Sequence, residues 1–146
     1  MGCGFVFKCR KCAKEFEISL DVGELYPQYC ERVKDDAVKG KYGKRAMKAV
    51  LNNPDGVFDC TRVIYKCECG FWHDNEKMIY CIPKQPRTDG EYYDEWDETN
   101  SLVIWARRHP CPRCRKEMKR FDGDVTTLKC PVCGGKLKQV DYILWD

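Results

Sequence analysis

Apolar and polar residues alternate between positions 15 and 20, where Phe16, Ile18 and Leu20 are separated by charged or hydroxyl side chains. A period of two is typical of a half-buried β-strand. With the apolar run that precedes it, residues 5–20 predict a β-hairpin whose turn holds the first Cys-x-x-Cys pair.

The period changes to that of a helix between residues 23 and 53. Gly40 and Gly43 interrupt the pattern, which predicts two helices rather than one. The turn-forming residues 52–56 end the second helix. One face of the first helix is predicted to carry Tyr26, Tyr29, Cys30, Val33 and Ala37.

Strand character returns over residues 57–83 and again after residue 101, so we expect a small mixed α+β protein. Its domains are predicted as a split β-ribbon over 1–83, with the helical insertion at about 23–53, and a second β-ribbon over 102–146. Residues 84–101 combine acidic and aromatic side chains, which is typical of a linker.

Twelve cysteines change this picture, because a small domain often needs a cross-link to remain folded. Neither an export signal nor a membrane span is apparent, so we expect a cytoplasmic protein whose paired cysteines bind metal. Two Cys-Pro-x-Cys pairs stand fifteen residues apart in the C-terminal part, at a spacing typical of a four-thiolate zinc site. The predicted ligands of this site are Cys111, Cys114, Cys130 and Cys133.

A second zinc ion is predicted between the first Cys-x-x-Cys pair and the Cys-x-Cys pair that follows the helices. Its expected ligands are Cys9, Cys12, Cys67 and Cys69. Either His73 or Cys60 could replace one of these four. Of the remaining cysteines, Cys30, Cys60 and Cys81 lie in apolar patterns and are expected in the core. Cys3, near the terminus, is the only one of them that we would test with a thiol reagent.

The formal net charge of +3 counts every thiol as neutral. A zinc ion with four thiolates carries −2, so two such sites bring the net charge to about −1. Net charge therefore gives no support to nucleic-acid binding, and only a local basic patch could contact phosphates. The candidate patch surrounds the Cys111 pair and comprises Arg107, Arg108, Arg113, Arg115, Lys116, Lys119 and Arg120.

The Cys111–Cys114 and Cys130–Gly135 segments resemble the zinc-ribbon superfamily, with metal-binding turns of the rubredoxin type. The resemblance extends over residues 103–140 and, more loosely, over 5–20 with 60–83. The N-terminal residues Met1-Gly2-Cys3-Gly4-Phe5 are also similar to the start of a group of uncharacterised bacterial proteins. Zinc ribbons serve as nucleic-acid-binding modules, as subunits of transcription and translation machinery and as protein-interaction adapters. Arg115 departs from rubredoxin, which has a glycine after the second cysteine.

We therefore expect a non-catalytic protein with two structural zinc ions and a protein partner. The first alternative is nucleic-acid binding through the basic patch, and the second is a rubredoxin-like iron electron carrier, since four thiolates bind either metal. With only two histidines and neither a nucleophile–base motif nor a phosphate-binding loop, enzyme activity and a small-molecule substrate are not expected.

Overall fold

The computed structural model describes residues 2–23, 26–83 and 101–145. These belong to two compact units, each assembled from segments that are distant in the sequence. Unit 1 comprises Met1–Gly23, Thr61–Glu76 and Arg108–Asp146, and unit 2 comprises Glu24–Cys60 and Lys77–Arg107.

This division cuts across the domains expected from the sequence, because unit 1 contains strands from both expected β-ribbons. The α+β class and the two helices agree with the sequence. Residues 84–100 of the expected linker lie outside the described residues.

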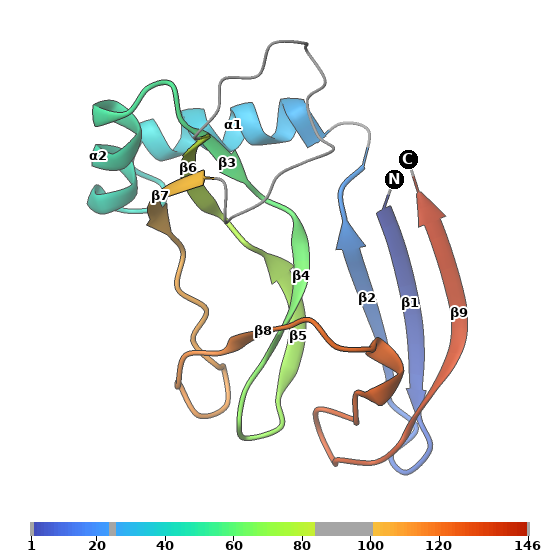
Figure 1. Cartoon of the computed structure of the whole chain (residues 1–146). Coiled ribbons are helices and arrows are strands. Elements are labelled where there is room, and N and C mark those ends of the chain that lie inside the picture. Colours follow the sequence, from blue (N-terminus) through green and yellow to red (C-terminus); the bar gives the residue numbers. More distant parts are fainter. Residues whose placement is uncertain (1, 24–25, 84–100, 146) are drawn as a thin grey trace. The chain divides into compact units, whose positions relative to one another are not determined.

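Unit 1 is built on one antiparallel sheet with the strand order β5-β4-β2-β1-β9, and β8 pairs with β4. Figure 1 shows β1 between β2 and β9. The strands are β1 (Gly2–Cys9), β2 (Glu15–Asp21), β4 (Arg62–Lys66), β5 (Trp72–Glu76), β8 (Lys119–Phe121) and β9 (Leu137–Trp145).

The sheet repeats one pattern twice. In each repeat a hairpin is followed later in the chain by a third strand, which pairs antiparallel with the first strand of that hairpin. The hairpin β1–β2 receives β9, so that Cys9 lies opposite Leu137. The hairpin β4–β5 receives β8, so that Lys66 lies opposite Lys119. The second repeat therefore lies inside the first in the sequence.

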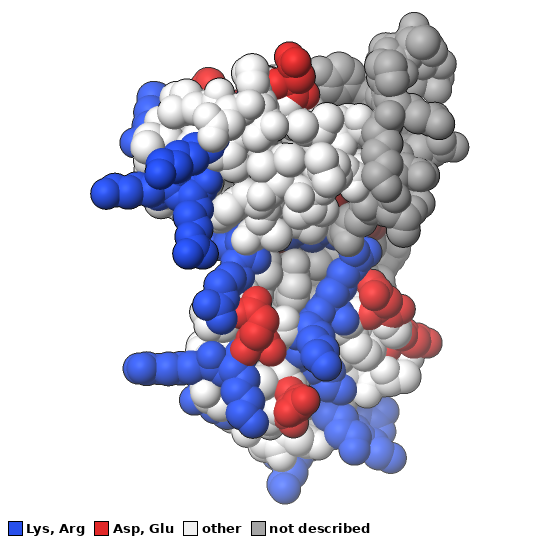
Figure 2. All heavy atoms as spheres, turned by 60° about the vertical axis from the view of Figure 1, so that its left-hand side comes forward, with Lys and Arg blue, Asp and Glu red and all other residues white. Residues whose placement is uncertain are grey.

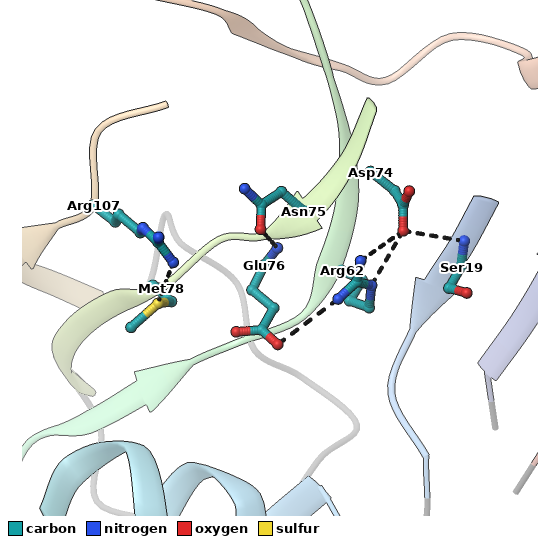
Figure 3. Close-up of polar contacts among 7 residues, drawn as sticks. All are labelled: Ser19, Arg62, Asp74, Asn75, Glu76, Met78 and Arg107. Carbon is teal, nitrogen blue, oxygen red and sulfur yellow. Dashed lines mark hydrogen bonds and ion pairs between the residues drawn. The ribbon is translucent and has the colours of Figure 1, made fainter. Parts of the chain in front are cut away.

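A polar network joins the two repeats (Figure 3). The only β2–β4 pair is Asp21 with Arg62. Asp74 Oδ2 accepts hydrogen bonds from Arg62 Nη2 at 2.8 Å and from the Ser19 amide at 3.2 Å. Arg62 also approaches Glu76, with 3.8 Å between Nη1 and Oε1. The Asp74 carboxylate thus connects β2 with the β4–β5 hairpin, and the half-exposed Arg62 guanidinium binds that carboxylate across the hairpin.

Glycines at the start of β1 allow an aromatic ring to lie against the backbone. A Cβ at Gly2 would come within 2.2 Å of Trp145 Nε1, and one at Gly4 within 2.8 Å of its Cζ3. Trp145 is opposite Gly2 in the β1–β9 register. These two glycines therefore let the end of β9 close over the first strand.

Unit 2 packs two helices on a three-stranded antiparallel sheet with the order β3-β6-β7. Its elements are α1 (Tyr26–Val38), α2 (Lys44–Asn52), β3 (Val57–Asp59), β6 (Ile79–Pro83) and β7 (Ser101–Ala106). The helix face predicted from the sequence points into this core: Val33 and Ala37 are buried, and Tyr26, Tyr29 and Cys30 pack against the same cluster. Among the described residues, no helix combines the length and the apolar character needed to cross a bilayer.

Candidate metal centres

Four short turns of unit 1 present the eight cysteines that the sequence singles out. We call them the first turn (9–12), the second turn (67–69), the third turn (111–114) and the fourth turn (130–133). The first and second turns close the hairpins β1–β2 and β4–β5, whereas the third and fourth turns precede β8 and β9.

The backbone has the same hydrogen-bond pattern in all four turns. The amide of the leading cysteine donates to a carbonyl beyond the turn, and its own carbonyl accepts from the residue that follows the second cysteine. The first bond is 2.8 Å long in every turn, to Lys14, Phe71, Lys116 and Gly135 respectively. The second bond comes from Ala13, Gly70, Arg115 and Gly134, at 2.8 to 3.1 Å.

The residue that follows the second cysteine has a positive φ in every turn. The angles are 95° at Gly70 and 75° at Gly134, where glycine adopts them without steric cost. They are 61° at Ala13 and 65° at Arg115, where a Cβ is strained in the left-handed region. Arg115 therefore has the same left-handed backbone conformation as the glycines of the second and fourth turns.

The first and fourth turns form the outer site, which consists of Cys9, Cys12, Cys130 and Cys133. Cys9 Sγ lies 3.5 Å from Cys133 Sγ, and Cys12 Sγ lies 3.7 Å from Cys130 Sγ. The pairing of β1 with β9 explains this meeting, because it carries the fourth turn to the end of the first hairpin.

The second and third turns form the inner site, which consists of Cys67, Cys69, Cys111 and Cys114. Cys67 Sγ lies 3.3 Å from Cys114 Sγ, and Cys69 Sγ lies 3.7 Å from Cys111 Sγ. Here β8 takes the place of β9: its pairing with β4 sets the third turn beside the second.

The partners of the turns therefore correct the sequence prediction. The sequence pairs the third turn with the fourth and the first with the second, as two ribbons in tandem. The structure pairs the first with the fourth and the second with the third. Neither His73 nor Cys60 belongs to a four-residue group among the described residues. The physical reason is that the third strand of each repeat returns to its own hairpin.

Both sites fit a four-coordinate metal ion. Four sulfurs at about 2.3 Å from a tetrahedral zinc ion are about 3.8 Å apart. The sulfurs of each site all lie within 4.8 Å of one another, whereas a disulfide requires about 2.05 Å. Every cysteine of the described chain is present as a thiol. The donor set suits zinc or iron, and it fills all four positions of a tetrahedral ion.

The thiols of the outer site differ in acidity. The hydrogen bond from the Cys12 amide lowers the pKa of Cys9 from 9.0 to about 6. Burial opposes this shift, whereas the Lys11 amide and the neighbouring thiols add to it. At Cys133 the Gly135 amide acts to lower the pKa, but burial and the three facing thiols raise it to about 11. Sulfurs this close cannot all carry a negative charge without a cation between them.

The thiols of the inner site also differ in acidity. Burial acts to raise the pKa of Cys111, but the amides of Cys114 and Arg113 and the thiols of Cys69 and Cys67 hold it at about 7. At Cys67 the Cys69 amide acts to lower the pKa, and burial together with the facing thiols raises it to about 12. In each site one thiol has a lowered pKa, which favours binding of a cation. Another thiol has a raised pKa and must lose its proton when a cation binds.

A buried residue stands two positions before the leading cysteine of every turn. These residues are Phe7, Tyr65, His109 and Leu128. The rings of Tyr65 and His109 stack at 3.8 Å, and Phe7 shares a core cluster with Leu128. The residues that meet in this way precede the same pairs of turns that form the metal sites, the second with the third and the first with the fourth. Sequence reasoning missed His109, although its strand-like spacing from Cys111 is the signal that could have placed it.

The seven residues of the predicted basic patch are all exposed. Arg107 belongs to unit 2 and the other six to unit 1. Several of them already have partners: Arg108 Nε lies 3.5 Å from Glu117, Arg120 Nε lies 2.8 Å from Asp122, and the Arg113 guanidinium donates to the Pro131 carbonyl.

No protein-family model matches this chain, and comparison with the curated proteins and with the solved structures returns no similar protein.

The pairing of the turns predicts zinc stoichiometry in double cysteine-to-serine variants. Removing Cys12 and Cys133 disables only the outer site, so one zinc ion per chain is expected to remain. Removing Cys114 and Cys133 disables both sites, so none is expected to remain bound at full affinity. A tandem pairing reverses these two results. Elemental analysis after dialysis against a weak chelator measures the ratio, and Cys3→Ser, which touches neither site, is the control.

The shared turn geometry predicts opposite effects of two substitutions on stability. Arg115→Gly relieves the left-handed strain and is expected to raise the free energy of unfolding by about 1 kcal/mol. Gly134→Ala introduces such strain and is expected to lower it by about 1 kcal/mol. Urea denaturation at a fixed free zinc concentration measures both. Arg115→Ala removes the long side chain but keeps the Cβ, and should give no stabilisation.

Zinc affinity of the outer site is expected to fall as the pH is lowered. Cys133, with its pKa raised to about 11, must lose a proton to the metal at any neutral pH. Below a pH of about 6 Cys9 is protonated as well, so the affinity should then fall more steeply. Calorimetry in buffers of different ionisation enthalpy, on Cys69→Ser/Cys114→Ser protein that lacks the inner site, measures the protons released. A pH-independent affinity would contradict the assignment.

Proposed function

We propose that this chain is a non-catalytic binding protein built on two zinc ribbons, one nested inside the other, with zinc as the structural metal. The observation that carries the proposal is the closed four-sulfur geometry of both sites. A zinc ion held by four protein sulfurs has no open position for water or substrate, so it stabilises a fold instead of activating a reactant.

The nested zinc-ribbon interpretation is supported by the repeated plan of unit 1. Each repeat has a hairpin with a metal-binding turn, a second metal-binding turn, and a third strand that returns to the hairpin. Zinc rather than iron is proposed because a closed tetrahedral set of four thiolates is typical of structural zinc sites. Absorbance distinguishes the two, since an iron–thiolate site is coloured and a zinc site is not.

The interaction surface that we propose is the edge strand β9. It pairs only with β1 among the described strands, so its outer backbone edge can accept another strand. Its apolar side chains are unusually exposed for their type: 48% at Val140, 48% at Tyr142, 41% at Ile143 and 58% at Leu144. An apolar edge strand of nine residues suits an extended segment of a protein partner.

The second candidate function is nucleic-acid binding through the basic patch. In Figure 2, Lys and Arg side chains are interspersed with Asp and Glu side chains. Arg108 has 86% of its side chain exposed, and Lys116 and Lys119 are exposed as well. The ion pairs of Arg108 and Arg120 and the near-zero net charge of the zinc-loaded chain favour the protein partner.

Affinity capture with matched variants tests the proposed partner class. Zinc-loaded protein is immobilised beside Tyr142→Lys/Leu144→Lys and Lys119→Glu/Arg120→Glu proteins, and each is exposed to lysate of the native host. We expect specific proteins that bind the wild type and the basic-patch variant, that are lost with the β9 variant, and that nuclease does not release.

Two outcomes would contradict the proposal. Capture that fails with the basic-patch variant and disappears after nuclease treatment would establish the nucleic-acid alternative. Equal capture by the wild type and the β9 variant would remove β9 as the interaction surface. Zinc content and the far-UV spectrum of each variant are the controls for folding.

A further inference from the structure

Unit 2 contains two cysteines that take no part in the metal sites. Cys30 lies on α1 and is half-buried, and Cys60 follows β3 and is 3% exposed. Both belong to the same apolar core, where Cys30 packs against the buried cluster that contains Cys60. Both are present as thiols.

Hydrogen bonds through Tyr26 hold the two segments together. The Cys60 amide donates to the Tyr26 hydroxyl at 2.8 Å, and that hydroxyl donates to Asp59 Oδ1 at 3.2 Å. Tyr26 stands one helical turn before Cys30 on the same face of α1. The chain at Cys60 is therefore fixed against the first turns of α1.

The two cysteines belong to one packed cluster in this arrangement, and the hydrogen bond from the Cys60 amide to Tyr26 holds Cys60 against the helix that carries Cys30. Such neighbours can become a disulfide without separating the helix from the sheet, provided that their side chains rotate to the bonding distance.

We propose that Cys30 and Cys60 form a redox-active dithiol, which is converted to an intramolecular disulfide by exchange with a small-molecule disulfide. Cys30 is the attacking thiol because it is the more accessible of the two. Cys60 is the resolving thiol, since it is buried beside the attacking sulfur. The reaction leaves the zinc-binding cysteines unchanged.

The exchange takes place in two balanced steps. The Cys30 thiolate, having given its proton to solvent, attacks one sulfur of the disulfide; a Cys30–S bond forms, the S–S bond breaks, and one thiolate leaves. Cys60, losing its proton in turn, then attacks the Cys30 sulfur and releases the second small thiolate. Cys30 and Cys60 lose two electrons together, and the small disulfide gains them as two thiols.

The acidity of Cys30 agrees with this assignment. The Cys60 thiol lowers the pKa of Cys30 against the effect of burial, and Tyr26 and the Cys60 amide also lower it. Burial, with the help of Asp21, raises the pKa of Cys3, whose sulfur lies 3.7 Å from the Asp21 carboxylate. A lower pKa gives a larger thiolate fraction at neutral pH. The directions of these two pKa shifts therefore agree with Cys30, rather than Cys3, as the attacking thiol.

The experiment exposes the full, zinc-loaded chain to buffers with graded ratios of oxidised to reduced glutathione. Peptide mapping by mass spectrometry identifies the disulfides, and a colorimetric chelator follows the zinc. We expect one Cys30–Cys60 disulfide, full reversal on reduction, and an unchanged zinc content. A Cys60→Ser protein should stop at the mixed disulfide on Cys30, because the resolving thiol is missing, and Cys30→Ser should form neither product.

Control variants keep the proposal falsifiable if a cysteine substitution weakens folding. Cys3→Ser and Cys81→Ser should behave as the wild type. Cys60→Ala and Cys60→Val test whether the mixed disulfide depends on serine at that position. The proposal is overturned if zinc loss accompanies every oxidation, if the disulfide joins other cysteines, or if folded Cys60→Ser protein accumulates no glutathione on Cys30. These outcomes are independent of whether β9 binds a protein.

Discussion

The meeting of four sulfurs from two distant turns is the constraint on which unit 1 depends. The turns of the outer site are separated by 118 to 124 residues along the chain, and those of the inner site by 42 to 47. Each doubling of a loop adds only about 0.6 kcal/mol to the cost of its closure, so the longer loops of the outer site cost only about 1 kcal/mol more than those of the inner site. The number of residues between two turns therefore has little effect on the free energy of bringing their cysteines together. The antiparallel pairing of β1 with β9, which runs from Gly2 to Cys9, is the stronger influence.

The same comparison explains how much the sequence could predict. A Cys-x-x-Cys turn is a local structure, and its residue types identify the ligands without knowledge of the fold. The identity of its partner is a property of the whole sheet. A prediction that pairs each turn with its nearest neighbour in the sequence is reasonable when the chain between them forms no strands that pair elsewhere. In this protein β8 and β9 each pair with a strand of an earlier hairpin. The α1 face was predictable for the opposite reason, because Val33 and Ala37 signal their burial within a few turns of helix.

Information about the pairing is nevertheless present beside each turn. The residues two positions before the leading cysteines are aromatic at Tyr65 and His109, which stack on each other, and Phe7 shares its cluster with Leu128. Side chains that pack against each other can carry matching chemistry, whereas the cysteines, being identical, carry none. The choice of partner is encoded next to the ligands rather than in them.

The segments of unit 2 are inserted between the strands of unit 1 along the chain. One of these segments joins β2 to β4 and the other joins β5 to the third turn, so both interrupt the sheet of unit 1. A folded insertion holds its own ends in place. It therefore reduces the loss of chain entropy when the strands of unit 1 on either side of it come together. A Cys30–Cys60 disulfide lies wholly within the first segment and shortens its effective length further. The redox state of this pair can therefore influence the stability of a sheet whose metal ligands do not take part in the redox step.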